Sequence, residues 1–150
     1  MKYTLARPGR IFILRLEDGD RLPDTLEQFA REQDIAAALV FFLGGVDGSS
    51  RLVVGPEDGT AVRPVPVITG LSGVSEAVGL GTLFRNGEGK PVLHLHAACG
   101  RGRETVTGCT RAGVEVWHIG EVVVLELLTG SARREVHPLS GFELLEIKEE

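Results

Sequence analysis

Cysteine and long apolar runs are both scarce in this chain of 150 residues. Its two cysteines, Cys99 and Cys109, cannot build the disulfide framework that replaces a core in small secreted domains, and a chain of this length can bury a core of its own. No apolar run approaches the roughly 20 residues of a membrane-spanning helix, and residues 1–10 lack the apolar segment of a signal peptide. We therefore expect one cytoplasmic domain over residues 1–150, with no membrane contact.

Positive charge is also in short supply. Lysine and arginine together number 16 against 21 acidic residues, which gives a formal net charge of −5. Affinity for nucleic acid depends on Lys and Arg side chains that displace phosphate counterions, so this balance excludes a general nucleic-acid binder. Basic residues cluster only at Arg101–Arg103 and Arg133–Arg134, and such short clusters are typical of a solvated surface. DNA stays open as a partner only through a local patch.

Aromatic residues make up only 5% of the chain, whereas 20 glycines and 7 prolines supply many turns. Short apolar runs between these turn signals predict strands. The run at 36–45 is apolar throughout, which is typical of a central strand covered on both faces. Pro64 and Pro66 limit their run to an edge strand or an irregular stretch. The predicted strands cover residues 10–16, 36–45, 51–55, 60–70, 76–84, 91–98, 113–128 and 142–147, with a hairpin over 79–98.

One main helix is predicted after the first strand. Asp20 can cap it, Pro23 suits its first turn, and it extends to about Gln33. An apolar stripe at helical spacing is formed by Leu22, Leu26, Phe29 and Ala30. Since strands outnumber helices and do not alternate with them regularly, the predicted fold class is α+β: a mostly antiparallel β-sheet with this helix packed on one face.

Histidine is rare, but two of the four histidines, His94 and His96, stand one residue apart on a predicted strand. Side chains at i and i+2 of a strand project from the same face, about 7 Å apart at the backbone, so one cation can bind both imidazoles. Beyond the turn at 100–104, a returning strand would place the thiolate of Cys109 opposite the pair. The three side chains predict a site for a divalent metal with an open fourth position. Two hydrogen-bonded histidines without a metal are the alternative.

The other candidate residues carry weaker signals. Cys99 faces the opposite side of a regular strand and is typical of a small buried hydrophobe. His118 lies on an apolar face and is interpreted as a core or interface residue, and His137 as an exposed loop residue. The carboxylates that could serve as a base are Glu104, Glu115 and Glu121. None has a diagnostic spacing, so the sequence assigns no catalytic residue.

Four segments, taken in chain order, resemble the PPC domain, the plants-and-prokaryotes conserved domain associated with AT-hook proteins. They are GRIFILRLEDGDRLPDTLEQFAREQDI from Gly9, the Gly44–Gly45 pair, LHLHAACGRGRETVTGC from Leu93 and GEVVVLEL from Gly120. The resemblance covers about residues 7–147 and is to the stand-alone prokaryotic type. It implies a single α+β domain with an antiparallel sheet, assembled as a homotrimer.

The same resemblance bears on the metal. In prokaryotic members the paired histidines are typically joined by a third histidine in a Gly-Gly-His motif, and metal, often zinc, is associated with this trio. The matching segment here is Thr107–Gly108–Cys109. Cysteine is a good zinc ligand, so the resemblance implies a zinc site of His94, His96 and Cys109; drift to a small buried residue is the alternative. We further hypothesise that Gly44, Gly45 and the turn at 100–104 shape a pocket or subunit contact around it.

The resemblance implies two functions: a DNA-associated regulator, or a trimeric protein-interaction module with a structural metal. A third, a metal-dependent hydrolase or lyase, follows from the chemistry of an open zinc site, which acidifies bound water and can polarise a carbonyl. The Arg101–Arg103 segment imitates an AT-hook, but Glu104 stands where the hook has proline and the segment lies inside the domain. The sequence therefore predicts a stand-alone PPC-like domain that binds a divalent metal, with its biochemical role and any enzymatic activity left open.

Overall fold

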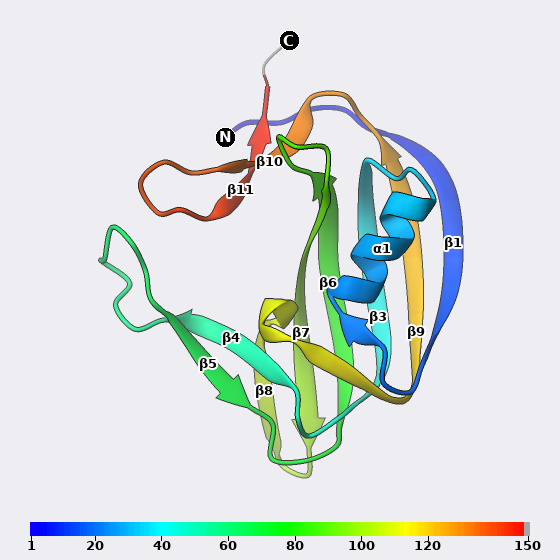
Figure 1. The fold of residues 1–150 in the computed structure, drawn as a ribbon, viewed down its shortest axis with the longest axis vertical. Coiled ribbons are helices and arrows are strands. Elements are labelled where there is room, and N and C mark those ends of the chain that lie inside the picture. The colour runs from blue at the N-terminus through cyan, green and yellow to red at the C-terminus, as the bar shows by residue number, and fades with distance from the viewer. Residues whose placement is uncertain (149–150) are drawn as a thin grey trace.

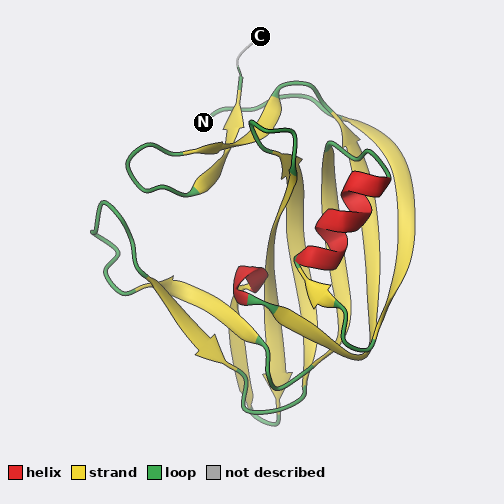
Figure 2. Ribbon diagram, in the orientation of Figure 1, coloured by secondary structure: helices red, strands yellow, loops and turns green. Residues whose placement is uncertain are grey.

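One large β-sheet organises the chain, and a single main helix lies across one of its faces (Figures 1 and 2). The structure is a computed structural model that describes residues 1–148. Its strands are β1 (Arg7–Glu17), β2 (Arg21–Leu22), β3 (Ala37–Val46), β4 (Arg51–Pro56), β5 (Pro66–Gly70), β6 (Ser75–Arg85), β7 (Pro91–Arg101), β8 (Glu104–Cys109), β9 (Val114–Leu128), β10 (Ala132–Val136) and β11 (Glu143–Ile147). Its helices are α1 (Asp24–Glu32) and the short 3-10 helix η1 (Thr110–Ala112).

The strands of the large sheet follow the order β1-β9-β3-β6-β7-β8-β4-β5, with β2 also paired to β9. These pairings are all antiparallel, which confirms the predicted class of a mostly antiparallel sheet with one main helix in a single domain. The proline-containing strand β5 lies at the sheet edge, as predicted. Strands β10 and β11 form a separate hairpin, which lies at the same side of the molecule as β4 and β5 (Figure 1).

Helix α1 covers the inner face of the sheet and buries Leu26 and Ala30 there. Leu26, Phe29 and Ala30 of the predicted apolar stripe lie on α1 and pack in the core, but Leu22 belongs to β2. The predicted cap is wrong: α1 begins at Asp24 and makes no side-chain cap hydrogen bond. The Asp20 carboxylate instead accepts the backbone N–H of Glu17 at 2.8 Å. That bond closes the turn from β1 into β2, so residues 21–22 pair with β9 instead of starting the helix.

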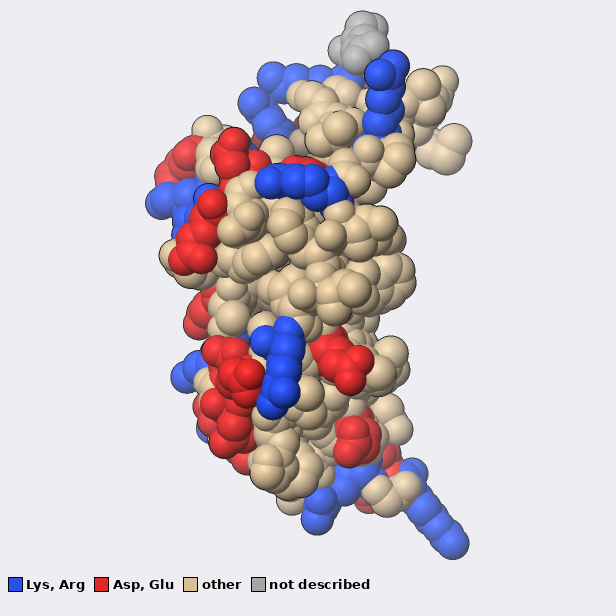
Figure 3. All heavy atoms as spheres, turned by 90° about the vertical axis from the view of Figure 1, so that its right-hand side faces the viewer, with Lys and Arg blue, Asp and Glu red and all other residues tan. Residues whose placement is uncertain are grey.

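The outer face of the sheet is apolar and uncovered. Strand β3 is central, lying between β9 and β6, but its outward side chains Phe41 and Leu43 are 43% and 57% exposed. The prediction that this strand is covered on both faces is therefore wrong for the single chain, because α1 packs on the inner face only. Figure 3, seen from the β1 side, shows uncharged atoms across the middle of the molecule with charged side chains gathered above and below.

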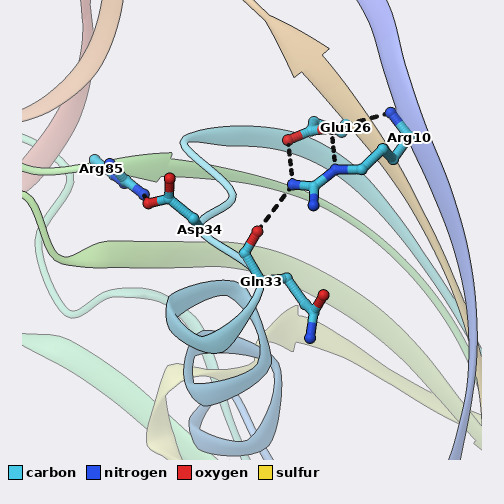
Figure 4. Close-up of polar contacts among 5 residues, drawn as sticks. All are labelled: Arg10, Gln33, Asp34, Arg85 and Glu126. Carbon is cyan, nitrogen blue, oxygen red and sulfur yellow. Dashed lines mark hydrogen bonds and ion pairs between the residues drawn. The ribbon is translucent and has the colours of Figure 1, made fainter.

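A charged cluster ties β1 to β9 where the sheet meets the end of α1 (Figure 4). The Glu126 carboxylate, 8% exposed, accepts the Nε, Nη2 and backbone N–H groups of Arg10 at 2.7, 2.7 and 3.0 Å. Arg10 also donates to the Gln33 carbonyl at the helix end. A Cβ on Gly9 would lie 2.7 Å from a carboxylate oxygen of Glu126, so glycine there allows the contact. Hydrogen bonds from Arg10 outweigh burial and lower the Glu126 pKa to about 2.

No helix among residues 1–148 is both long enough and apolar enough to cross a membrane.

Candidate metal centre

His94 and His96 lie on the outer face of β7, as their spacing predicts. They pair with Thr82 and Leu80 of β6 respectively, and both side chains are exposed. Their Nε2 atoms are 3.1 Å apart, with the rings edge to face. Two nitrogens that each lie about 2.0–2.1 Å from a tetrahedral zinc are roughly 3.3 Å apart, so the two rings already stand at the separation that a shared ion requires.

The returning strand β8 brings Cys109 to the same place. His96 pairs with Cys109 across β7 and β8, and paired residues of antiparallel strands face the same side. The Cys109 thiol, 4% exposed, and the two imidazoles offer ligand atoms that all lie within 4.8 Å of one another. Because neutral imidazole and thiolate are both zinc ligands, this donor set fits a divalent metal.

Close approach of β4 closes the site behind Cys109. Val53 of β4 pairs with Cys109, and a Cβ added to Gly108 would lie only 2.5 Å from the Val53 carbonyl oxygen. Glycine at this position therefore lets β4 cross β8 and cover the thiol. Sequence reasoning matched residues 107–109 to a family motif without giving this steric reason for the glycine.

Positive charge and burial together act on His94. Its pKa is lowered, first by burial and then by the positive charges of Arg134, His96 and Arg111. A lower pKa increases the fraction of neutral imidazole near pH 7, and only the neutral ring has a lone pair for a metal.

Three hollows meet at these side chains. The largest, about 720 Å³, is a cleft beside β7 that includes His94 and Cys109 in its wall. The others, about 260 and 390 Å³, lie against β4 and on the outer face of β6 and include His96. We call the 720 Å³ hollow the β7 cleft. It gives a ligand access to the metal candidates from the side of the β10–β11 hairpin.

The remaining sequence candidates fall elsewhere. Cys99 belongs to the hydrophobic core at 2% exposure, and burial raises its pKa to about 11, which confirms its interpretation as a buried hydrophobe. His137 is exposed, as expected, with Nδ1 2.9 Å from the Ser140 hydroxyl. His118 is exposed and not a core residue. Its positive φ of 62° and its backbone N–H bond to Asp18 turn it away from the regular face of β9.

The carboxylates singled out by sequence lie away from the three donors. Glu115 and Glu121 are on β9, and the strands β3 and β6 separate β9 from β7. Glu104 pairs with Arg101 at the end of the β7–β8 hairpin. The carboxylates that do line the β7 cleft are Glu27 and Glu143, which sequence reasoning missed because they come from a helix and a hairpin distant in the chain.

Glu27 binds the free edge of β7. Its carboxylate accepts the backbone N–H of Leu93 at 2.9 Å, where β8 does not pair with β7. Burial raises the pKa of this carboxyl more than the hydrogen bond from Leu93 lowers it. Glu27 therefore provides the hydrogen-bond acceptor that the unpaired edge of β7 lacks at Leu93. This bond lies next to His94, the residue that follows Leu93 in the chain.

Gly44 and Gly45 serve the packing of β3 against β9. A Cβ on Gly44 would meet the Ile119 carbonyl oxygen at 2.4 Å, and one on Gly45 the Trp117 carbonyl oxygen at 2.8 Å. The turn at 100–104 lies at the far end of β7, where Arg101 donates to the Val74 carbonyl at 2.6 Å. The structure thus gives these glycines and this turn local packing roles; their part in a subunit contact stays a prediction.

Solved structures share this fold along nearly the whole chain. A metal-containing protein from Archaeoglobus fulgidus is 28% identical, with a TM-score of 0.81 over 96% of this chain and 98% of that one. A plant- and prokaryote-conserved (PPC) protein from Pyrococcus horikoshii is 19% identical, with a TM-score of 0.81 over 100% and 99%. A protein with a provisional DNA-binding name from Ralstonia eutropha is 22% identical, with a TM-score of 0.69 over 91% and 90%. None of the curated proteins compared with the chain matches it.

A family model covers most of the sequence. It is described as the Plants and Prokaryotes Conserved (PCC) domain and matches residues 3–128, a span that includes α1, the sheet strands β1 to β9 and all three metal candidates. The resemblance found in the sequence motifs is thereby confirmed. The chain belongs to the plants-and-prokaryotes conserved domain family, abbreviated PPC or PCC.

Proposed function

We propose that this protein binds one divalent metal per chain, zinc by preference, through His94, His96 and Cys109. The observation that carries the proposal is the convergence of three ligand atoms within 4.8 Å, brought about by the β7–β8 register. A thiolate beside two imidazoles favours zinc over hard cations such as magnesium, which prefer oxygen. The related Archaeoglobus protein is described as metal-containing, which supports a metal in this chain too.

A three-ligand site leaves a position for water or a ligand, and zinc bound there would supply Lewis acidity and acidify a coordinated water. The chain's own residues would orient the metal: β4 covers Cys109 from one side, and the β7 cleft opens beside His94 on the other. Metal-assisted hydrolysis or lyase chemistry is therefore the enzymatic alternative. A structural metal that only links β7 to β8 is the other.

We also propose that the protein is a cytoplasmic homotrimer whose subunits bury the outer face of the sheet. The support is a set of exposed apolar side chains on this face, far more than a solvated sheet face needs. They are Ile11, Ile13, Phe41, Leu43, Val78, Leu80 and Ile119. Free thiols, one of them a candidate metal ligand, suit the reducing cytoplasm.

The DNA alternative has little support beyond the names of related proteins. Arg101 is engaged with the Val74 carbonyl, and Arg133 is paired with Glu135, so both basic clusters make internal contacts. A net charge of −5 also opposes phosphate binding. A protein-interaction role through the trimer surface agrees better with the exposed apolar face.

Native mass spectrometry combined with elemental analysis tests the metal proposal, on protein purified without chelator or affinity metal. We expect about one zinc per chain in the wild type, and loss of zinc from His94→Ala/His96→Ala and from Cys109→Ala. Cys99→Ala is the matched control, because it removes a thiol from the core face of β7, opposite His94 and His96, and should keep the zinc. A wild-type protein that takes up no divalent metal even on titration with zinc refutes the proposal.

A further inference from the structure

A buried arginine without an acidic partner stands beside the metal candidates. Arg134 of β10 is 4% exposed, yet it makes no ion pair among residues 1–148. Within that part of the chain its guanidinium donates only from Nη2, to the Thr82 hydroxyl and carbonyl at 2.9 and 3.4 Å. Its Nε is buried with no hydrogen-bond partner there. Burial of a cation without a counter-charge is unfavourable, so this arrangement is one that an anion would stabilise.

The arginine lies in the wall of the β7 cleft together with His94, Cys109 and Arg111. Thr82, which holds its Nη2, is the β6 residue paired with His94, so Arg134 is fixed on the same face as the imidazoles. Arg111 follows Cys109 in η1 and stacks over the Phe142 ring with its guanidinium carbon 5.3 Å from the centroid. Two guanidinium groups therefore border the approach to the metal candidates.

The two acids of the cleft do not cancel these charges. Glu27 is already bonded to the Leu93 N–H at 2.9 Å, and Glu143 accepts the Asn86 side-chain amide at 3.1 Å. Glu143 lies near enough to raise the pKa of Arg134 against the effect of burial, but it makes no ion pair with it in the described chain. The guanidinium therefore keeps donors that have no hydrogen-bond partner in the described chain.

The rest of the wall is apolar. Val92 contributes from β7, and Phe142, Leu144 and Leu145 contribute from the chain around β11. A volume of about 720 Å³ lies in the range of small-molecule sites, which combine an apolar wall with a few placed polar groups. An apolar wall that also holds two guanidinium groups matches a molecule that has an apolar body and one anionic group.

We propose that the β7 cleft binds a small organic carboxylate, with its carboxylate paired to Arg134 beside His94 and its apolar body on the β10–β11 hairpin. The planar guanidinium presents its donors in the fork geometry that carboxylates match. If the metal of the proposed function were held by His94, His96 and Cys109, the same carboxylate would lie beside it, because His94 and Cys109 line this cleft. That part of the inference rests on the proposed function; the pairing with Arg134 does not.

Calorimetric titration with benzoate and hexanoate, on protein of measured zinc content, tests this proposal. We expect both acids to bind the wild type, with benzamide, the neutral counterpart of benzoate, binding at least about tenfold more weakly, as removal of a charge-assisted hydrogen bond implies. Arg134→Gln should weaken benzoate by a similar factor. Arg133→Gln, its neighbour on the same strand, is the matched control and should leave benzoate affinity unchanged.

The outcomes separate this proposal from the metal proposal. Zinc-loaded wild type that binds neither acid overturns the carboxylate site and leaves the metal site standing. Benzoate that binds through Arg134 with equal affinity in zinc-loaded and metal-free protein keeps the carboxylate site and refutes its metal contact. If Arg134→Gln does not fold, Arg134→Lys takes its place in the titration. In addition, NMR shifts of the His94 ring are then followed as benzoate is added to the wild type, and the absence of any shift refutes the site. The carboxylate site is also refuted if an Arg134 variant changes its oligomeric state but binds benzoate as tightly as the wild type.

Discussion

Gly108 shows how one missing side chain positions another residue's ligand atom. Its Cα faces the carbonyl of Val53 so closely that a Cβ would sit 2.5 Å away, and the next residue, Cys109, is paired with that same Val53. Anything that pushes β4 outward therefore also moves the thiol and uncovers it. The geometry of the metal candidates depends on a residue that binds nothing.

We predict that Gly108→Ala lowers both stability and zinc affinity. Overpacking against backbone costs about 1–3 kcal/mol, and the displaced β4 would open the site around Cys109. Denaturant unfolding of the metal-free protein and a zinc competition titration measure the two effects. Gly100→Ala on β7 is the control, because its Cβ would find its nearest neighbour at 3.6 Å, an ordinary contact. Equal behaviour of the two variants would contradict the prediction.

The positions of the metal candidates were predictable from the sequence, because they depend on the alternation of side chains along a strand and on one turn. The i, i+2 spacing placed His94 and His96 on one face and Cys99 on the other, and the turn at 100–104 returned Cys109 to the pair. Arg134 and Glu27 were not predictable, because they reach the cleft from separate elements through tertiary packing. Neither residue has a local spacing that marks it.

At the scale of elements, the Arg10–Glu126 cluster joins β1, β9 and the end of α1 through four hydrogen bonds from Arg10. Strand β1 is the edge of the sheet and shifts its register between Pro8 and Ile11, where ladder hydrogen bonds are interrupted. The buried carboxylate of Glu126 replaces them. Docking of β1 therefore depends on an ionised carboxyl group.

This dependence predicts a specific response to acid. The pKa of Glu126 is about 2 when folded and 4.5 ordinarily, so its contribution to stability is fully present above pH 4.5 and is lost as the pH falls from 4.5 toward 2. Arg10→Gln removes the group that lowers this pKa. We expect its melting temperature to fall well below that of the wild type at pH 7, and the difference to shrink as pH approaches 2.

Thermal unfolding monitored by circular dichroism between pH 2 and pH 7 measures the difference in melting temperature between the wild type and Arg10→Gln. Arg15→Gln is the matched control on the same strand, since the Arg15–Glu17 pair is 67% exposed at both side chains and such pairs contribute little. A gap between wild type and Arg10→Gln that stays constant over this pH range would show that Arg10 acts through packing and not through the Glu126 carboxylate.

The elements themselves followed from the sequence more closely than their boundaries and environments did. Apolar runs identified the strands of the large sheet except β2, which was missed, and β8, which was expected only as a strand returning beside β7. The Asn86–Gly87 turn identified the β6–β7 hairpin. The start of α1 was misplaced because Asp20 forms a turn that allows β2 to pair. The prediction that β3 is covered on both faces failed for the single chain. A continuous apolar run indicates that both faces avoid water, but not whether the same chain or another one packs on the second face.

At the scale of the whole molecule, the uncovered outer face of the sheet leads to a prediction about oligomeric state. Val78 of β6 is 61% exposed and pairs with Leu43 of β3, and both belong to the apolar set proposed as the subunit interface. A charge placed there would have to be buried in the assembly without a partner. We expect Val78→Lys to shift the native mass from trimer toward monomer while the circular dichroism spectrum is retained.

The matched control is Val54→Lys on β4, which is also exposed, at 41%, but belongs to a strand near the opposite end of the sheet. Its mass should equal that of the wild type. A wild-type mass corresponding to the single chain, at any concentration tested, would refute the trimer and leave the outer face for another partner.

The two cysteines lie on the neighbouring strands β7 and β8 and face opposite sides of the sheet, so their reactivities report on different events. Cys99 is sealed in the core with a pKa of about 11, so it should resist a small thiol-alkylating reagent for as long as the fold persists. Cys109 borders two hollows, so we expect the reagent to reach it when no metal is bound. Labelling of Cys109 alone would follow metal occupancy, whereas labelling of both would follow unfolding, so a single mass spectrum would distinguish loss of the ion from loss of the structure.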